Sequence, residues 1–179
     1  MVALKAGEIE SFLRKPDPAV RIFLLYGPDI GLAHERSRKL ITKLIDDPEN
    51  AFQLIRIDGE SLGSDTSRLH DEANTVGLFG DKRAIWLRSA QRLSAGYWES
   101  LFKEKPLCPI IIEAGDLPAR HALRAAAEAC KHAAALPCYA DDIRDLPRLI
   151  DEVLGSAGLS ATDEARMAMT GALGADRLL

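Results

Sequence analysis

The sequence lacks several patterns that would assign it to a particular class of protein. It has no run of roughly 18 apolar residues, and its first residues, MVALKAGEIESFL, do not contain the long apolar core of a signal peptide, so we expect neither a membrane span nor a secretory leader. Aromatic residues make up only 6% of the 179 residues while 47% are hydrophobic, which indicates a globular protein with an aliphatic core. The formal net charge of −4 provides no overall positive field that would attract nucleic acid or anionic lipid.

Residues that bind metals or attack substrates are also scarce. The three cysteines have no metal-ligand spacing: Cys108, Cys130 and Cys138. An odd number of cysteines in apolar segments fits a reducing compartment, so we expect a cytoplasmic protein. The four histidines do not form an HExxH or similar pattern, and no Gly-x-Ser-x-Gly stretch is present. We therefore expect no catalytic residues, no metal and no cofactor.

Short apolar runs alternate with segments of helical periodicity along most of the chain. The apolar runs predict five buried strands, at residues 20–26, 51–58, 83–88, 109–114 and 133–139. Because strands separated by helices are joined by right-handed crossovers, the sequence predicts an α/β fold with a five-stranded, mostly parallel sheet flanked by helices, of the AAA+ or P-loop type. A proline cannot donate a ladder hydrogen bond, so Pro137 predicts that the fifth strand lies at a sheet edge.

Two of the connecting helices have recognisable beginnings. Residues 64–75 form a mostly polar segment, and Ser64 or Asp65 is the expected N-cap of a helix there. Asp116 is the expected cap of another helix, with Pro118 in its first turn.

The pattern changes after Tyr139. Apolar residues then recur at helical spacing, and this stripe contains Ile143, Leu146, Leu149, Ile150, Val153 and Leu154. A further helix is predicted to run to about Leu173. We expect an α/β domain at residues 1–140 and the beginning of a small all-helical domain at residues 141–179. Because two helices make a poor core alone, we expect either that the chain is a fragment or that these helices pack against something missing.

The stretch YGPDIGLAHERS lies where a nucleotide-binding protein has its phosphate loop, between a strand and a helix. It contains Gly27 and Gly31, but Leu32 and Ala33 stand where the loop needs a lysine for the phosphates and a Ser or Thr for magnesium. The third predicted strand ends in Arg88 instead of the acid that would hold magnesium through water. Two missing requirements argue against nucleotide hydrolysis, so we interpret the two glycines as a degenerate, non-functional phosphate loop that serves as a strand-to-helix turn.

The stretch VGLFGDKR differs from the rest of the predicted core. A polar helix ends near Thr75, and Leu78 and Phe79 then lie between Gly77 and Gly80, which predicts a flexible or sharply turned surface loop. Two large apolar side chains on such a loop either fold back onto their own sheet or are offered to a partner. The residues alone favour folding back, because most large apolar side chains are buried.

Four stretches occur in an order that resembles the delta subunit of the bacterial DNA polymerase III clamp loader: YGPDIGLAHERS, LFGDKRAIWLR, IIIEAGDLP and LPCYADDIRDL. The resemblance implies an AAA+-type first domain, a small helical second domain and a helical collar domain. On this resemblance we expect the collar to be missing from this sequence and the second domain to be cut short. The resemblance also implies a role in DNA replication as a clamp opener that does not hydrolyse ATP, within a DNA-directed DNA polymerase (nucleotidyltransferase) holoenzyme.

In that family the clamp-binding element is a Leu-Phe pair on the loop before the third strand, and Leu78 and Phe79 occupy the matching positions. The residues expected to shape this loop are Thr75, Val76, Gly77 and Gly80. The implied partners are the sliding clamp, which is the beta subunit, and the other loader subunits, gamma or tau and delta prime. DNA is expected to be contacted only within the assembled complex, and no membrane is involved.

Two other functions remain open from the sequence. One is a nucleotide-binding enzyme of the P-loop type with an unusual loop, such as a small kinase. The other is a regulatory α/β module that binds an unrelated protein partner.

Overall fold

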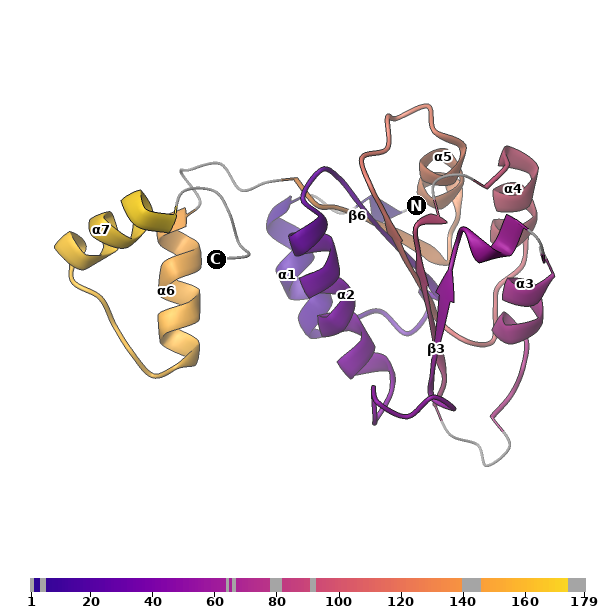
Figure 1. The fold of residues 1–179 in the computed structure, drawn as a ribbon, viewed down its shortest axis with the longest axis horizontal. Helices are drawn as coiled ribbons and strands as arrows, with labels where there is room; N and C mark the ends of the chain where they lie inside the picture. The colour runs from indigo at the N-terminus through magenta and orange to yellow at the C-terminus, as the bar shows by residue number, and fades with distance from the viewer. Residues whose placement is uncertain are drawn as a thin grey trace. The chain divides into compact units, whose positions relative to one another are not determined.

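Figure 1 shows the computed structural model of the protein, which describes residues 2–3, 6–63, 65, 67–77, 82–90, 93–139 and 146–173. The chain divides into two compact units, Met1–Cys138 and Tyr139–Leu179. Within the described ranges, no helix is both long enough and apolar enough to cross a membrane.

A six-stranded sheet forms the centre of the first unit, and its strand pairs are parallel. The strand order is β1-β6-β2-β5-β4-β3. The strands are β1 (Val2–Ala3), β2 (Ile22–Tyr26), β3 (Leu54–Asp58), β4 (Ala84–Arg88), β5 (Ile110–Ala114) and β6 (Ala133–Pro137). The predicted α/β fold and its five strands are confirmed, and β1 is an additional strand of 2 residues, too short for a periodic pattern to reveal.

The position of β6 differs from the prediction that it lies at an edge. β1 pairs with Ala134 and Ala135, so β6 has neighbours on both sides. On the β1 side the described pairing stops before Pro137, and on the β2 side the Cys138 N–H donates to the Tyr26 carbonyl oxygen at 2.6 Å. The proline therefore interrupts neither ladder, because β1 is too short to need its missing donor.

Helices cover both faces of the sheet (Figure 1). On one face lie α1 (Ala6–Arg14) and α2 (Ile30–Leu44), and on the other lie α3 (Arg68–Ala73), α4 (Ala95–Lys103) and α5 (Ala122–Ala129). Alternate residues of β2 enter the two resulting cores: Ile22 and Leu24 pack with α3, α4 and α5, while Phe23 and Leu25 pack with α1 and α2. Since both faces are covered, the central strands are continuous apolar runs.

Helix α3 is shorter than the predicted polar helix. It begins at Arg68, after a 3-10 helix at Ser61–Gly63. The Asp65 carboxylate accepts a hydrogen bond from the Arg68 N–H at 3.3 Å, so Asp65 supports the start of the helix although Ser67 occupies the N-cap position. The other expected cap, Ser64, lies outside the described residues.

The prediction that Asp116 caps the following helix is wrong. Helix α5 begins at Ala122, and its N-cap is His121, whose Nδ1 accepts from the Leu123 N–H at 3.3 Å. Leu117 is buried in the core, so the chain is still packed against the rest of the unit where the helix was expected to begin.

The second unit contains helices α6 (Leu146–Ser156) and α7 (Asp163–Leu173). Helix α6 ends in a Schellman-type turn, in which Gly158 has a φ of +71° and the Leu159 N–H donates to the Leu154 carbonyl oxygen at 2.8 Å. The Arg166 guanidinium of α7 donates to the Asp151 carboxylate of α6 at 2.9 Å, which joins the two helices. These are the helices that the apolar spacing predicts after the sheet.

Candidate protein-interaction site

Because β3, β4 and β5 are parallel neighbours, their amino ends lie side by side. We call this side of the sheet, where the strands begin, the amino edge. The segment that connects α3 to β4 ends here, at the amino end of β4. Its described parts are its two ends, residues 74–77 and 82–83. The predicted clamp-binding residues Leu78 and Phe79, and the predicted loop residue Gly80, lie outside the described residues.

Arg83 joins the two ends of this segment. Its Nη1 donates to the Thr75 carbonyl oxygen at 2.9 Å, and its Nη2 donates to the Glu72 carboxylate at 2.7 Å. Its Nε donates to the Phe52 carbonyl oxygen at 3.3 Å, which ties the segment to the residues that precede β3. The Arg83 side chain is only 10% exposed, so solvent screens these charge-assisted hydrogen bonds weakly.

Cys108 fastens the end of α3 to the segment before β5. The Cys108 N–H donates to the Ala73 carbonyl oxygen at 2.9 Å, and its thiol donates to the Thr75 carbonyl oxygen at 3.2 Å. Burial raises the pKa of the Cys108 thiol, so the sulfur keeps the proton that it donates. Sequence reasoning assigned neither Cys108 nor Arg83 a role in fastening this segment, because their contacts join residues that no local pattern connects.

A cleft of about 410 Å³ opens beside this segment. The predicted loop-shaping residues that the structure describes all line it: Thr75, Val76 and Gly77. Val76 is 69% exposed, Leu107 in the same lining is 57% exposed, and Phe52 at the same edge is 82% exposed. Lys82 also lines the cleft and is paired with Asp46 at 2.7 Å. Exposed apolar side chains gathered at one edge are typical of a protein-binding surface.

The degenerate phosphate loop lies on the opposite side of the sheet, where the strands end. We call this side the carboxyl edge, and the loop follows β2 there. Gly27 has a φ of +147°, and a Cβ atom there would come within 1.9 Å of the Cys138 carbonyl oxygen, so this position requires glycine. Gly31, which was predicted to share the turn, is instead in the first turn of α2. The geometric role inferred for the pair therefore belongs to Gly27.

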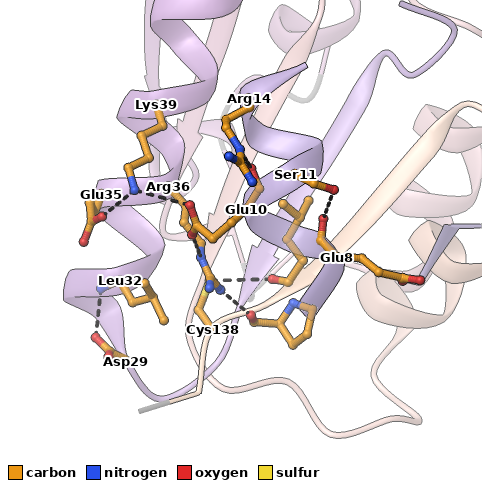
Figure 2. Close-up of polar contacts among 12 residues, drawn as sticks. Glu8, Glu10, Ser11, Arg14, Asp29, Leu32, Glu35, Arg36, Lys39 and Cys138 are labelled. Carbon is orange, nitrogen blue, oxygen red and sulfur yellow. Dashed lines mark hydrogen bonds and ion pairs between the residues drawn. The ribbon is translucent and has the colours of Figure 1, made fainter. Parts of the chain in front are cut away.

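Several N–H groups that would hold a phosphate at this turn are already engaged. The Gly27 N–H donates to the Gly115 carbonyl oxygen and the Asp29 N–H donates to the Cys138 carbonyl oxygen, both at 3.2 Å. The Asp29 carboxylate caps α2 by accepting from the Leu32 N–H at 2.8 Å (Figure 2). A carboxylate at a helix N-terminus occupies the place where a phosphate would bind and repels it. This geometry supports the interpretation of the loop as non-functional in nucleotide binding.

A buried arginine fixes α2 to the end of β6. The Arg36 side chain is 9% exposed, and its Nη1 donates to the Pro137 carbonyl oxygen at 2.7 Å and to the Cys138 sulfur at 3.8 Å. Its Nε lies 3.8 Å from the Glu10 carboxylate of α1, and Lys39 pairs with the same carboxylate at 3.5 Å (Figure 2). This cluster joins α1, α2 and β6. Sequence reasoning missed it, because an arginine on a helix is usually a surface residue.

The end of β4 carries Arg88, whose Nε lies 3.9 Å from the Glu113 carboxylate of β5. A cation at this position repels magnesium, as the sequence indicated. Across the part of the chain that the structure describes, no group of three or more His, Cys, Asp and Glu side chains is placed to hold a metal ion.

The sequence model of a known family, DNA polymerase III, delta subunit, matches residues 23–107. The matched part runs from β2 to the segment before β5, so it contains both the degenerate phosphate loop and the segment with Leu78 and Phe79. Over these residues the chain is similar to the delta subunit, and in this sense it is delta-like. The resemblance seen in the sequence is confirmed over residues 23–107.

Two solved structures share the fold of the delta-like chain. The DNA clamp loader delta protein of Bacillus subtilis matches with a TM-score of 0.66 and 18% identity, over 92% of this chain and 52% of that chain. A DNA polymerase III gamma subunit-related protein of Thermotoga maritima matches with a TM-score of 0.50 and 16% identity, over 96% and 60%. The delta-like chain thus spans about half the length of the B. subtilis protein, and at these identities the similarity shows the fold alone. No curated protein sequence matches the chain.

Proposed function

We propose that the delta-like chain is a clamp-loader subunit that binds and opens the ring-shaped sliding clamp during DNA replication, without hydrolysing ATP itself. The observation that carries this proposal is the match to the delta-subunit family, which spans the segment with Leu78 and Phe79. The exposed apolar residues at the same sheet edge support it, because a surface that binds a protein ring has to present apolar area to solvent.

Two apolar side chains account for much of the expected affinity but not for all of it. Transfer of one Leu and one Phe into an apolar pocket of the clamp contributes roughly 3–6 kcal/mol. Micromolar binding needs about 8 kcal/mol, and the entropy lost on association has to be offset as well. Val76, Leu107 and Phe52 border the segment and are each more than half exposed, so we assign the additional contact area to them.

The fastened base of the segment contributes by limiting the conformations that are lost on binding. Arg83 holds the two ends together and is itself paired with Glu72, and Cys108 holds the end of α3. An anchored loop loses less conformational entropy on association than a free one. In this proposal Arg83 and Cys108 are positioning residues, while Leu78 and Phe79 contact the clamp.

Ring opening in this proposal follows from contacts beside the apolar pocket, which distort the nearby interface between clamp subunits. ATP acts on the partner subunits of the loader, gamma or tau and delta prime, and changes whether the segment is exposed. The engaged turn at Gly27 and Asp29 supports this division of labour, because it offers a phosphate a carboxylate instead of free donors. DNA is contacted in the assembled, cytoplasmic complex.

Surface plasmon resonance with the purified clamp of the same organism tests the proposal. The Leu78→Ala/Phe79→Ala variant is expected to bind about 100- to 20,000-fold more weakly, the change that corresponds to roughly 3–6 kcal/mol. Its thermal unfolding midpoint should stay within roughly 2 °C of the wild type. Ile30→Ala is the matched control, because Ile30 is 71% exposed at the start of α2, where its loss should leave clamp binding unchanged.

Two outcomes would contradict the proposal. Equal clamp binding by the wild type and the double variant would show that the pair is not a contact. Unfolding of the double variant would show that both side chains belong to the core. Ring opening is measured separately, as the release of clamp rings from closed circular DNA, which the double variant should abolish.

A further inference from the structure

A second cleft, of about 400 Å³, lies on the α2 face of the sheet, over β3 and β4. The charged and ring-bearing residues in its lining include His34, Arg38, Glu49, Arg56, Trp86 and Arg88. This cleft shares no lining residue with the cleft beside the candidate interaction segment. It is therefore a separate feature of the molecule, formed by residues that the proposed clamp contact does not use.

The cleft is positive in a chain that is negative overall. Three arginines line it against Glu49, and the Glu113 carboxylate lies 3.9 Å from Arg88, so the arginines outnumber the nearby carboxylates by one, whereas the whole chain has a formal net charge of −4. The Arg56 guanidinium donates to the Pro48 carbonyl oxygen at 2.9 Å and lies 4.0 Å from the Glu49 carboxylate, whose side chain is 88% exposed. An ion pair with so exposed a carboxylate is weak, so Arg56 can exchange it for a stronger anion.

A stack of planar groups forms the floor of the cleft. The centroid of the His34 ring lies 5.2 Å from that of the Trp86 ring, and the Arg88 guanidinium lies 5.9 Å from the Trp86 ring. Glu113 of β5 fixes this stack: its carboxylate accepts from Trp86 Nε1 at 2.9 Å and lies 3.5 Å from His34 Nδ1 and 3.9 Å from Arg88 Nε. Trp86 is buried, but the side chains of His34 and Arg88 are 42% and 60% exposed, so they present outer surface to a ligand.

We propose that this cleft binds single-stranded nucleic acid, with the arginines on its phosphates and the exposed part of His34 against a base. Guanidinium groups match phosphate oxygens with paired N–H donors, and planar side chains stack on bases of any sequence. An acidic peptide would use the charge but not the planar floor, which favours nucleic acid. A cleft of this volume accommodates about one nucleotide, with the neighbouring phosphates on the arginines of the rim.

Three phosphate contacts produce a measurable salt dependence. Each contact with a single strand contributes about −0.7 to the slope of log K against log salt concentration, so three contacts give a slope of about −2. This slope corresponds to a roughly twentyfold loss of affinity between about 50 and 200 mM salt. The slope therefore reports the contacts themselves and not only the affinity.

Fluorescence anisotropy of a labelled oligothymidine strand, titrated with the whole chain across this salt range, tests the proposal. The Arg38→Gln/Arg56→Gln/Arg88→Gln variant is expected to bind about tenfold or more weakly and to lose most of the salt slope. His34→Ala should weaken binding severalfold while the slope stays unchanged, because it removes stacking and no phosphate contact.

The matched control removes the same charge from exposed positions outside the cleft. It combines Arg14→Gln, Lys103→Gln and Lys131→Gln, on α1, on α4 and after α5. This control should bind the oligonucleotide like the wild type. Equal losses in the two triple variants would show that only net charge matters and would overturn the proposal.

Competitors distinguish the ligand classes that share this chemistry. Displacement of the oligonucleotide by polyglutamate at equal charge concentration would overturn the proposal in favour of an acidic protein partner. Displacement by inorganic phosphate at equal phosphate concentration would overturn it in favour of a small-anion site. Resistance to both competitors supports a nucleic-acid site.

The nucleic-acid proposal and the clamp proposal fail separately. The Leu78→Ala/Phe79→Ala variant should keep oligonucleotide binding, and the triple glutamine variant should keep clamp binding. If the triple variant does not fold, Arg38→Gln alone replaces it, because this exposed helical position tolerates substitution. The single variant is expected to reduce the magnitude of the salt slope by about 0.7, and an unchanged slope would overturn the proposal.

Discussion

The carboxyl edge and the amino edge of the sheet differ in whether their polar groups are hydrogen-bonded internally and whether their apolar side chains are exposed. At the edge where β2 ends, the N–H groups of Gly27 and Asp29 donate to neighbouring carbonyl oxygens, and the Asp29 carboxylate caps α2. At the edge where β3, β4 and β5 begin, Val76 and Phe52 are largely exposed beside a segment that Arg83 fastens. The polar groups of the carboxyl edge are hydrogen-bonded within the chain, whereas the amino edge exposes apolar area to which a partner can bind. A scaffold of the nucleotide-binding type can therefore keep its turn while recognition is located at the other edge.

The largest effect on stability is expected at the carboxyl edge, from the substitution Gly27→Ala. The new Cβ atom would lie 1.9 Å from the Cys138 carbonyl oxygen, at a backbone φ of +147°. We expect the free energy of unfolding, measured by urea denaturation, to fall by about 4 kcal/mol or more. Gly96→Ala is the control, because a Cβ atom at this position of α4 meets no atom within 4 Å and should be neutral or stabilising. Similar stabilities for the two variants would mean that the turn is not closely packed.

The next largest effect on stability is expected at the amino edge, from the substitution Arg83→Met. Removal of the guanidinium leaves the Glu72 carboxylate and the Thr75 carbonyl oxygen without this donor, so the free energy of unfolding should fall by about 2–3 kcal/mol. Clamp binding should weaken about tenfold, because a looser segment loses more entropy on association. Hydrogen exchange at residues 75–77 should become faster.

Lys82→Met is the matched control for Arg83→Met. Lys82 pairs with Asp46 at 2.7 Å, but the two side chains are 62% and 66% exposed. Loss of so exposed a pair should cost about 0.5 kcal/mol or less. If both variants lost the same stability, Arg83 would not be the residue that holds the segment.

A smaller effect on stability is expected from the removal of the Asp29 cap of α2 at the carboxyl edge. Asp29→Ala should cost about 1 kcal/mol of unfolding free energy, and Asp29→Asn should cost less because its side chain can still accept from the Leu32 N–H. Calorimetry with ATP and magnesium should detect no binding by either variant, since the Gly27 and Asp29 N–H groups remain engaged. Submillimolar affinity in either variant would show that the carboxylate alone kept nucleotide out.

The smallest effect is a pH dependence of stability that arises from Cys108 at the amino edge. Burial raises the pKa of Cys108 above its ordinary value of 9.0, so the unfolded chain loses this proton first as the pH rises. The contribution of Cys108 to stability is complete below the unfolded pKa and is lost as the pH rises through the folded pKa. Cys108→Ala should therefore lose stability less steeply above about pH 9 than the wild type, in urea denaturation at several pH values. Parallel pH profiles would contradict this assignment.

The sheet was largely predictable because helices cover both of its faces. Every residue of β2 from Ile22 to Tyr26 is buried, and such a strand is recognisable as an uninterrupted apolar run. β1 has 2 residues and no period of its own, so the edge position predicted for β6 was wrong. The start of α5 was misplaced because Asp116 and Pro118 form a local helix signal, whereas the burial of Leu117 is a tertiary effect.

The candidate site was predictable only where it is local. The assignment of Leu78 and Phe79 to clamp binding came from the resemblance and stays a prediction. The contacts of Arg83 and Cys108 with the Thr75 carbonyl oxygen depend on the neighbouring positions of α3, β4 and β5 in the fold. A linear pattern contains no information about such meetings, and the same holds for the cleft over β3 and β4.

The contacts of Arg36 have a mechanical consequence. The chain leaves the α/β unit just after Cys138, where Arg36 holds Pro137 and the Asp29 N–H holds the Cys138 carbonyl oxygen. A force that pulls on the residues after Tyr139 acts first on these bonds and on the Cys138 N–H bond to the Tyr26 carbonyl oxygen of β2. Arg36 shares such a load with α2 and, through Glu10, with α1.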